Sequence, residues 1–327
     1  MILDFSTLSK YRTELMGLGT LLILICHMPA SVPEMPQSVG YVLSIGNIGV
    51  DFFLFISGFG IYHSLNKSGQ SMKAWYGRRF KRILVPYLLI SVPFYVFKDW
   101  SFGIERMLLD ISTISFWTEH QGAWFIALLL PLYLIAPFIK EKCQPIWKGM
   151  TICLALAIMA LILSLYTYNP HDVVANISFA LMRVPSFVLG MMMAPLILNN
   201  GKININPLKA LMLAFIPVVL IGAGKVLLHD LYLMWLAIPL LLYLACFGLQ
   251  KLPESLVWTM KWGGRISLES YLLNIYNVQL LVGVDLGFSN YWKYGVMVVF
   301  DIVLALLVWR IGQVIVNRNY SFNTISK

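Results

Sequence analysis

The sequence predicts an all-α membrane protein, a bundle of about ten transmembrane helices with both termini in the cytoplasm. Apolar residues make up 59% of the 327 residues and charged residues only 12%, about half the charged share of a soluble protein. The apolar residues fall in blocks of about twenty, the length that an α-helix needs to cross the hydrocarbon core. The basic residues gather in alternate connections between these blocks, as the positive-inside rule requires.

The first predicted span, residues 11–29, carries a cation at its start and a histidine near its end. Arg12 and His27 lie about 22 Å apart along a helix, and no charged residue lies between Leu15 and Cys26. A histidine inside the membrane is costly to bury and usually faces a protein interior or a wet cavity. His27 is therefore the first candidate functional residue. Because nine further spans follow, we expect a retained helix here rather than a signal peptide.

Turn and helix-breaking residues separate the later spans, and no internal repeat or long linker divides the chain. We therefore expect a single transmembrane domain over residues 1–327. The predicted spans after the first are residues 41–65, 83–97, 121–139, 149–168, 178–198, 207–224, 229–249, 267–286 and 291–312.

The distribution of Lys and Arg predicts the orientation of the bundle. With a cytoplasmic N-terminus, 19 of the 24 basic residues lie in cytoplasmic segments and 5 on the outer side, which satisfies the positive-inside rule with both termini inside. Topology thus accounts for the net charge of +9, so we expect the lipid bilayer, and no nucleic acid, as a partner. The outer basic residues are Lys98, Arg106, Arg183, Lys225 and Lys293.

Two predicted connections differ from the rest. The cytoplasmic loop from Lys67 to Arg82 ends in GRRFKRILVPY, with four cations within five residues at the mouth of the third span. Two interpretations stay open. The cations orient the span and attract anionic lipid, or they bind an anionic ligand, since arginine binds phosphate bidentately. The outer loop from Lys98 to Gln121 is the longest connection and is rich in acidic residues, and we expect it to be long enough to shape a substrate mouth.

Chemistry inside the spans centres on His27 and Asp51. The imidazole suits a general base acting on a hydroxyl, although a histidine that only bonds a backbone carbonyl is the alternative. An ionised carboxylate in the membrane needs a partner or a cavity, so Asp51 is expected to orient or charge-stabilise His27. Arg183, at the outer start of the sixth span, either pairs with Asp51, holds an oxyanion or extends to the membrane interface.

Other polar and aromatic side chains predict an internal cavity. Ser57 precedes Gly58, where it serves either helix packing or chemistry. Trp124 and Tyr133 lie on a fourth span that two prolines make irregular. The ninth span is too polar to face lipid, so we expect part of it to line the cavity. Its polar residues are Ser267, Glu269, Ser270, Tyr271, Asn274 and Asn277.

Sequence motifs for other chemistry are absent. The four cysteines show no CxxC or Cys/His ligand spacing, so we expect neither a metal site nor a disulfide framework. The chain has no phosphate-loop, GxSxG or HExxH motif either.

These residues together resemble the acyltransferase-3 family, integral membrane proteins that O-acylate sugars and other cell-surface acceptors. The resemblance covers nearly the whole chain and includes the family's ten-span core with an intracellular N-terminus. The segments that carry it are the first span ending in His27, GVDFFLFISGF at 49–59, RRFKRILVPY at 78–87, AWFIALLLPLYLIAP at 123–137, RVPSFVLG at 183–190 and SLESYLL at 267–273.

The chain departs from the family pattern at two positions. The family usually has an arginine eleven residues before the histidine, where this chain has Met16, and it often has a histidine where this chain has Asn274. Eleven helical residues bring position 16 within ~20° of the face of His27. Arg12, one turn earlier with Glu14 nearby, is placed to substitute for the usual arginine.

The resemblance implies transfer of an acyl group, most simply acetyl from cytoplasmic acetyl-CoA, to a hydroxyl of an envelope polysaccharide or a lipid-linked sugar precursor at the bacterial inner membrane. His27 would deprotonate the hydroxyl or relay the acyl group, Asp51 would orient the imidazole, and Arg183 would stabilise the oxyanion. The arginines expected to hold the CoA phosphates are Arg78, Arg79 and Arg82. The residues expected to line the cavity or contact substrate are Arg12, Glu14, Ser57, Trp124, Tyr133, Tyr271 and Asn274.

Two other functions stay open. A transporter or flippase for a glycan or lipid precursor would also need a polar interior and cations at both mouths, although the sequence shows neither an inverted repeat nor paired broken helices. The protein could also be an inactive member of the family that acts as a sensor or assembly partner. This would explain why Met16 replaces the usual arginine. Protection of the Arg78–Arg82 segment by CoA would favour the enzyme.

Overall fold

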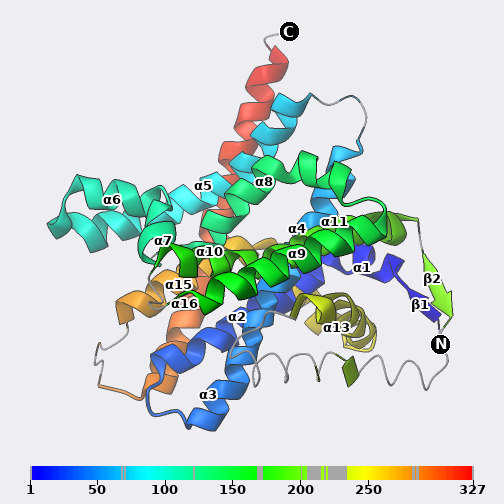
Figure 1. Cartoon of the computed structure of the whole chain (residues 1–327). Helices are drawn as coiled ribbons and strands as arrows, with labels where there is room; N and C mark the ends of the chain where they lie inside the picture. The colour runs from blue at the N-terminus through cyan, green and yellow to red at the C-terminus, as the bar shows by residue number, and fades with distance from the viewer. Residues whose placement is uncertain are drawn as a thin grey trace.

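The computed structural model describes residues 2–67, 69, 71–120, 122–167, 172–199, 201–204, 215, 216, 219, 234–281, 284 and 287–325. These residues form a bundle of helices, and the short strands β1 (Ile2–Asp4) and β2 (Lys202–Asn204) pair antiparallel beside it. Figure 1 shows this ribbon at one side of the bundle and α6 (Ile104–Ile111) projecting from the opposite side, with α7 (Ile114–Glu119) between α6 and the bundle. The predicted all-α membrane fold is confirmed.

Seven stretches of helix in the described ranges are long and apolar enough to cross a membrane. They are α2 (Arg12–Ser31), α3 (Gln37–Ser44) continued through a 3-10 turn by α4 (Ile48–Leu65), α5 (Met72–Asp99), α8 (Trp124–Lys142), α9 (Ile146–Leu165), α10 (Val173–Leu181) continued by α11 (Val184–Leu198), and α16 (Asn290–Ile325) as far as Val316. The remaining helices that matter below are α1 (Ser6–Lys10), α13 (Met234–Leu249), α14 (Glu254–Arg265) and α15 (Ser267–Leu281).

Several predicted boundaries need correction. The third predicted span, 83–97, is part of the longer helix α5, so the basic residues before it lie on a helix and not in a loop. The predicted outer loop folds into α6 and α7, and the tenth span continues well past residue 312. The predicted span 207–224 lies largely outside the described residues. The number ten and the cytoplasmic termini stay predictions.

The sixth predicted span is two helices joined at Arg183. Pro185 follows directly after the break, in the first turn of α11. Proline lacks the backbone N–H that a continuous helix needs and fits the first helical turn, where that N–H has no partner. The break gives Arg183 a position between α10 and α11 rather than inside a regular turn.

The helices α4 and α11 approach each other at two glycines. A methyl group on Gly58 would overlap the carbonyl of Phe187, and one on Gly190 would overlap the carbonyl of Phe55. Small residues let membrane helices pack backbone to backbone. The packing role expected beside Ser57 is thus confirmed for Gly58, and α4 with α11 forms the tightly packed centre of the bundle.

Candidate functional site

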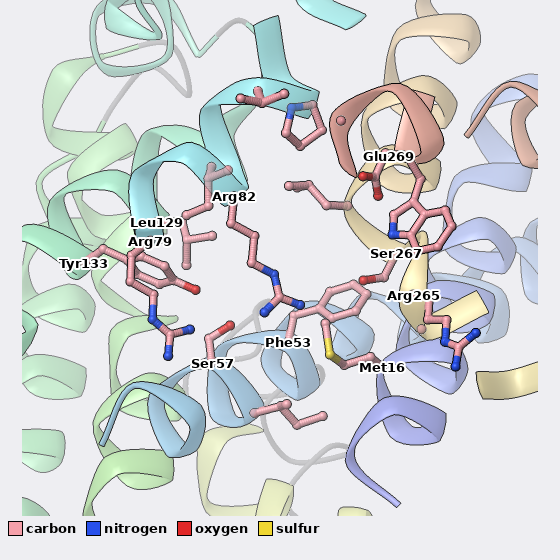
Figure 2. A pocket seen from close by; sticks show the side chains of 18 of the residues that line it. Met16, Phe53, Ser57, Arg79, Arg82, Leu129, Tyr133, Arg265, Ser267 and Glu269 are labelled. Carbon is pink, nitrogen blue, oxygen red and sulfur yellow. The ribbon is translucent and has the colours of Figure 1, made fainter. Parts of the chain in front are cut away.

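A cavity of about 650 Å³ opens between α2, α4, α5, α8, α15 and α16. We call it the arginine cavity, because Arg12, Arg78, Arg79, Arg82 and Arg265 line it. Figure 2 shows Arg79 and Arg82 reaching in from α5, with Tyr133 beside Arg79 and Glu269 on the other side. Glu269 is the single acidic side chain among the described residues of its wall.

Local helix geometry brings the cations together. Ser71 caps α5 by accepting a hydrogen bond from the Ala74 N–H at 3.3 Å, so the basic segment starts a stable helix. Arg78 and Arg82 are four residues apart and share one face of that helix. Lys81 lies on another face and does not line the cavity.

Arg12 and Arg79 meet around a glycine on α4. The Arg79 Nη2 donates to the Gly60 carbonyl at 3.3 Å, and a methyl group on Gly60 would lie 2.5 Å from the Arg12 Nη2. The Arg12 guanidinium also lies 6.0 Å from the ring centre of Phe59. Among the described residues, no carboxylate forms an ion pair with Arg12, Arg79 or Arg82. In the part of the chain that the structure describes, no direct ion pair therefore neutralises these three arginines.

The structure sorts the predicted cavity residues into two groups. Arg12, Ser57, Tyr133 and Tyr271 line the arginine cavity, and so does Met16, at the position where the family usually has arginine. Those predicted to contact substrate but absent from this wall are Glu14, Trp124 and Asn274.

His27 lies at a second polar centre, formed with α15 and α16. Its Nδ1 is 2.7 Å from the Asn274 Oδ1, and the Asn274 Nδ2 donates to the Asp301 Oδ2 at 3.2 Å. The other oxygen of Asp301 accepts from the Asn277 Nδ2. Asn274 and Asp301 are completely buried, so this chain of hydrogen bonds is fixed inside the bundle.

The chain of hydrogen bonds sets the protonation of the histidine ring. A carboxylate only accepts, so the Asn274 amide must turn its NH2 group to Asp301 and its oxygen to His27. That oxygen also only accepts, so the proton of a neutral imidazole lies on Nδ1. The Nε2 lone pair is then available as a base.

Asp51 is not the partner of His27. Its Oδ2 accepts from the Arg183 Nη1 and its Oδ1 from the Ser186 hydroxyl at 2.7 Å. The prediction that Asp51 orients the imidazole is corrected: Asn274 holds the ring, and Asp51 is engaged elsewhere. The alternative in which Arg183 pairs with Asp51 is confirmed, and extension to the interface is excluded because Arg183 is only 1% exposed. Neither residue lines the arginine cavity.

Two helices connect the arginine cavity with His27. On α2, Met16 lines the cavity and His27 lies about 17 Å farther along the axis. On α15, Tyr271 lines the cavity and Asn274, one turn later, contacts the histidine. Met16 and His27 are eleven residues apart on α2, so their side chains lie within about 20° of one face of this helix.

Sequence reasoning missed Asp301 and left Glu269 without a role. Asp301 is the only acidic residue of α16, and a lone carboxylate in an apolar span is itself a signal for a buried partner. Its partner Asn274 was expected to line the cavity or contact substrate, and not to bond a carboxylate of the tenth span. Among the described residues, no group of three His, Cys, Asp or Glu side chains is placed to hold a metal ion.

Comparison with known proteins identifies the family. The acyltransferase-3 family model, described as an acyltransferase domain, matches residues 16–310, nearly the whole chain. No curated protein and no solved structure matches the chain. The match contains the arginine segment of α5, His27, Asn274 and Asp301. This multi-pass membrane protein therefore belongs to the acyltransferase-3 family and is an acyltransferase.

Proposed function

We propose that the protein transfers an acyl group, most simply acetyl, from cytoplasmic acyl-CoA to a hydroxyl of an envelope polysaccharide or a lipid-linked sugar precursor. The observation that carries this proposal is the arginine cavity, in which four arginines from α2 and α5 converge and one carboxylate opposes them. CoA carries a diphosphate and a further phosphate, and arginine binds phosphate bidentately. The volume of about 650 Å³ lies in the range of small-molecule sites.

The donor would bind with its phosphates at Arg12, Arg79 and Arg82. Its flexible arm would extend along α2, past Met16, and bring the thioester to His27. The cytoplasmic position of the arginines rests on the charge distribution of the sequence. It agrees with the cytoplasm as the source of acyl-CoA and with a place in the bacterial inner membrane.

His27 would act as the general base. Its Nε2 takes the proton of the acceptor hydroxyl as that oxygen attacks the acyl carbonyl carbon. The new C–O ester bond forms, the C–S bond breaks, and the departing thiolate of CoA takes the proton from Nε2. Asn274 and Asp301 keep the second ring nitrogen protonated throughout, so Nε2 is ready for each cycle.

Binding of CoA to the purified protein tests the donor site. Arg79→Gln removes a cation of the cavity, and we expect it to weaken CoA binding about 10- to 100-fold, as for the loss of a hydrogen bond to a charged group. Lys81→Gln is the matched control, because Lys81 is basic and exposed, lies two residues away on the same helix and does not line the cavity. Equal CoA affinity in wild type and both variants, measured by calorimetry, would place the donor elsewhere.

A further inference from the structure

A second hollow, which we call the apolar groove, lies between α2, α14, α15 and α16. Its volume is about 660 Å³, and Leu21, Trp258, Trp262, Val303 and Arg310 are among its lining residues. Val303 and Trp258 are each 62% exposed, so the groove opens to the surface that faces lipid in a membrane protein. Trp309 lines both the groove and the arginine cavity and separates the two.

The groove is apolar along its length and has a cation at one end. On α2 it extends from Gly17 to Leu24, and on α16 from Arg310 back to Ile302, which is about 12 Å of helix. Arg310 is exposed and makes no ion pair among the described residues. The charged end is the one that the sequence assigns to the cytoplasmic side.

Three tryptophans line the groove, and one of them, Trp309, directly precedes Arg310 in the sequence. The ring centres of Trp258 and Trp262 are 5.9 Å apart, and those of Trp262 and Trp309 are 6.0 Å apart. Indoles are enriched where the hydrocarbon of a membrane meets its headgroups. Deeper in the groove, the Ser270 hydroxyl is buried and finds no hydrogen-bond partner among the described residues.

We propose that the apolar groove binds one anionic glycerophospholipid of the cytoplasmic leaflet. The phosphate would pair with Arg310 and one acyl chain would lie along the groove toward Leu24 and Ile302. Basic sites between helices on the cytoplasmic side attract anionic headgroups, and an acyl chain covers the exposed apolar wall. This site lies outside the arginine cavity, so the inference does not depend on the proposed acyl-CoA chemistry.

Native mass spectrometry with phosphatidylglycerol and phosphatidylcholine of identical acyl chains tests the proposal. The wild type is expected to retain phosphatidylglycerol more tightly. Arg310→Gln is expected to weaken phosphatidylglycerol binding about fivefold and to leave phosphatidylcholine unchanged. Lys251→Gln, at an exposed basic residue that does not line the groove, should change neither.

A second pair of variants tests the chain-binding wall. Val303→Trp fills the groove from an exposed position and should weaken retention of both lipids. Val299→Trp is its control, because Val299 is 63% exposed on the same helix and does not line the groove. The proposal is overturned if Arg310→Gln keeps the wild-type preference, or if the two tryptophan variants behave alike. It is also overturned if a second copy of the chain, lost in Val303→Trp, occupies the groove instead of lipid.

Discussion

At the scale of single residues, the chemistry of His27 depends on where one proton lies. The Asp301 carboxylate orients the Asn274 amide, and the amide oxygen keeps the proton of a neutral ring on Nδ1. Asp301 does not touch the histidine, so we regard it as a positioning residue.

Asp301→Asn should lower acyl transfer about 10²- to 10⁴-fold, the range of general-base catalysis. Asparagine at this position offers both a donor and an acceptor, so the Asn274 amide is free to turn its NH2 group to His27, which would place the ring proton on Nε2. The measurement is the pH dependence of kcat/KM, which should lose the limb due to His27 while CoA affinity is unchanged. The matched variant Asn277→Ala removes only the other bond to Asp301 and should keep the wild-type pH profile. A wild-type profile in Asp301→Asn would contradict the positioning role.

At the scale of elements, two features hold α4 and α11 together. Their backbones approach closely at Gly58 and Gly190, and a buried ion pair joins the side chains of Asp51 and Arg183. Asp51 and Arg183 are each 1% exposed, and Ser186 satisfies the second oxygen of the carboxylate. Asp51 was expected to orient or charge-stabilise His27 because an ionised carboxylate inside the membrane needs a partner or a cavity. The sequence could not show that the break before Pro185 turns Arg183 toward Asp51, since that depends on how α4 and α11 pack.

Asp51→Ala should lower stability by about 3–5 kcal/mol, because it leaves the Arg183 charge buried without its partner. Thermal unfolding in detergent measures this loss. The fraction that stays folded should keep its CoA affinity and a kcat close to wild type. If instead stability were unchanged and kcat fell, Asp51 would act on His27 after all.

The helices α6 and α7 should loosen in acid. Arg106 bridges Asp110 at 2.9 Å and Glu119 at 2.6 Å, and Lys98 lies 3.6 Å from Asp110. Burial raises the pKa of Asp110, but the surrounding polar groups and cations, Arg106 and Lys98 among them, outweigh it and hold the pKa below its ordinary value of 3.8. A depressed carboxyl pKa stabilises the folded state above the ordinary value, and this contribution is lost as pH falls through the lowered one.

Hydrogen exchange of α6 and α7 as a function of pH measures that loosening. Protection beyond the intrinsic rates should fall below about pH 4 in the wild type. In Arg106→Gln it should already be low at neutral pH and change less in acid. Identical pH curves for the two proteins would contradict the ion-pair account.

At the scale of the whole molecule, composition and charge were sufficient to predict the class of fold. Blocks of apolar residues predict membrane helices because the bilayer core imposes a length, and the structure bears this out for seven stretches of its described part. Helical periodicity placed position 16 on the same face of α2 as His27, whereas the structure puts Met16 on the wall of the arginine cavity and His27 beside Asn274, outside that wall. Contacts between helices far apart in the sequence, such as His27 with Asn274, could not be predicted because periodicity says nothing about which helices become neighbours.

Cysteine labelling of intact cells should reveal the predicted orientation. In a Cys26→Ser background, Ser112→Cys on the outer segment is expected to react with a membrane-impermeant maleimide, and Lys73→Cys only after permeabilisation. Both positions are exposed. The native Cys143 should not react with the maleimide, because it is buried and burial raises the pKa of its thiol to about 11. The reverse labelling pattern would invert the topology and remove the cytoplasmic access on which the donor site depends.

Transfer of radiolabel from acetyl-CoA to envelope glycan tests the central claim, with membranes that contain wild type, His27→Ala or His63→Ala at equal amounts of folded protein. His63 is exposed near the end of α4 and serves as the matched histidine control. We expect comparable label with wild type and His63→Ala, and at least about 10²-fold less with His27→Ala. Label that is undiminished in His27→Ala would contradict the assignment of His27 as the base.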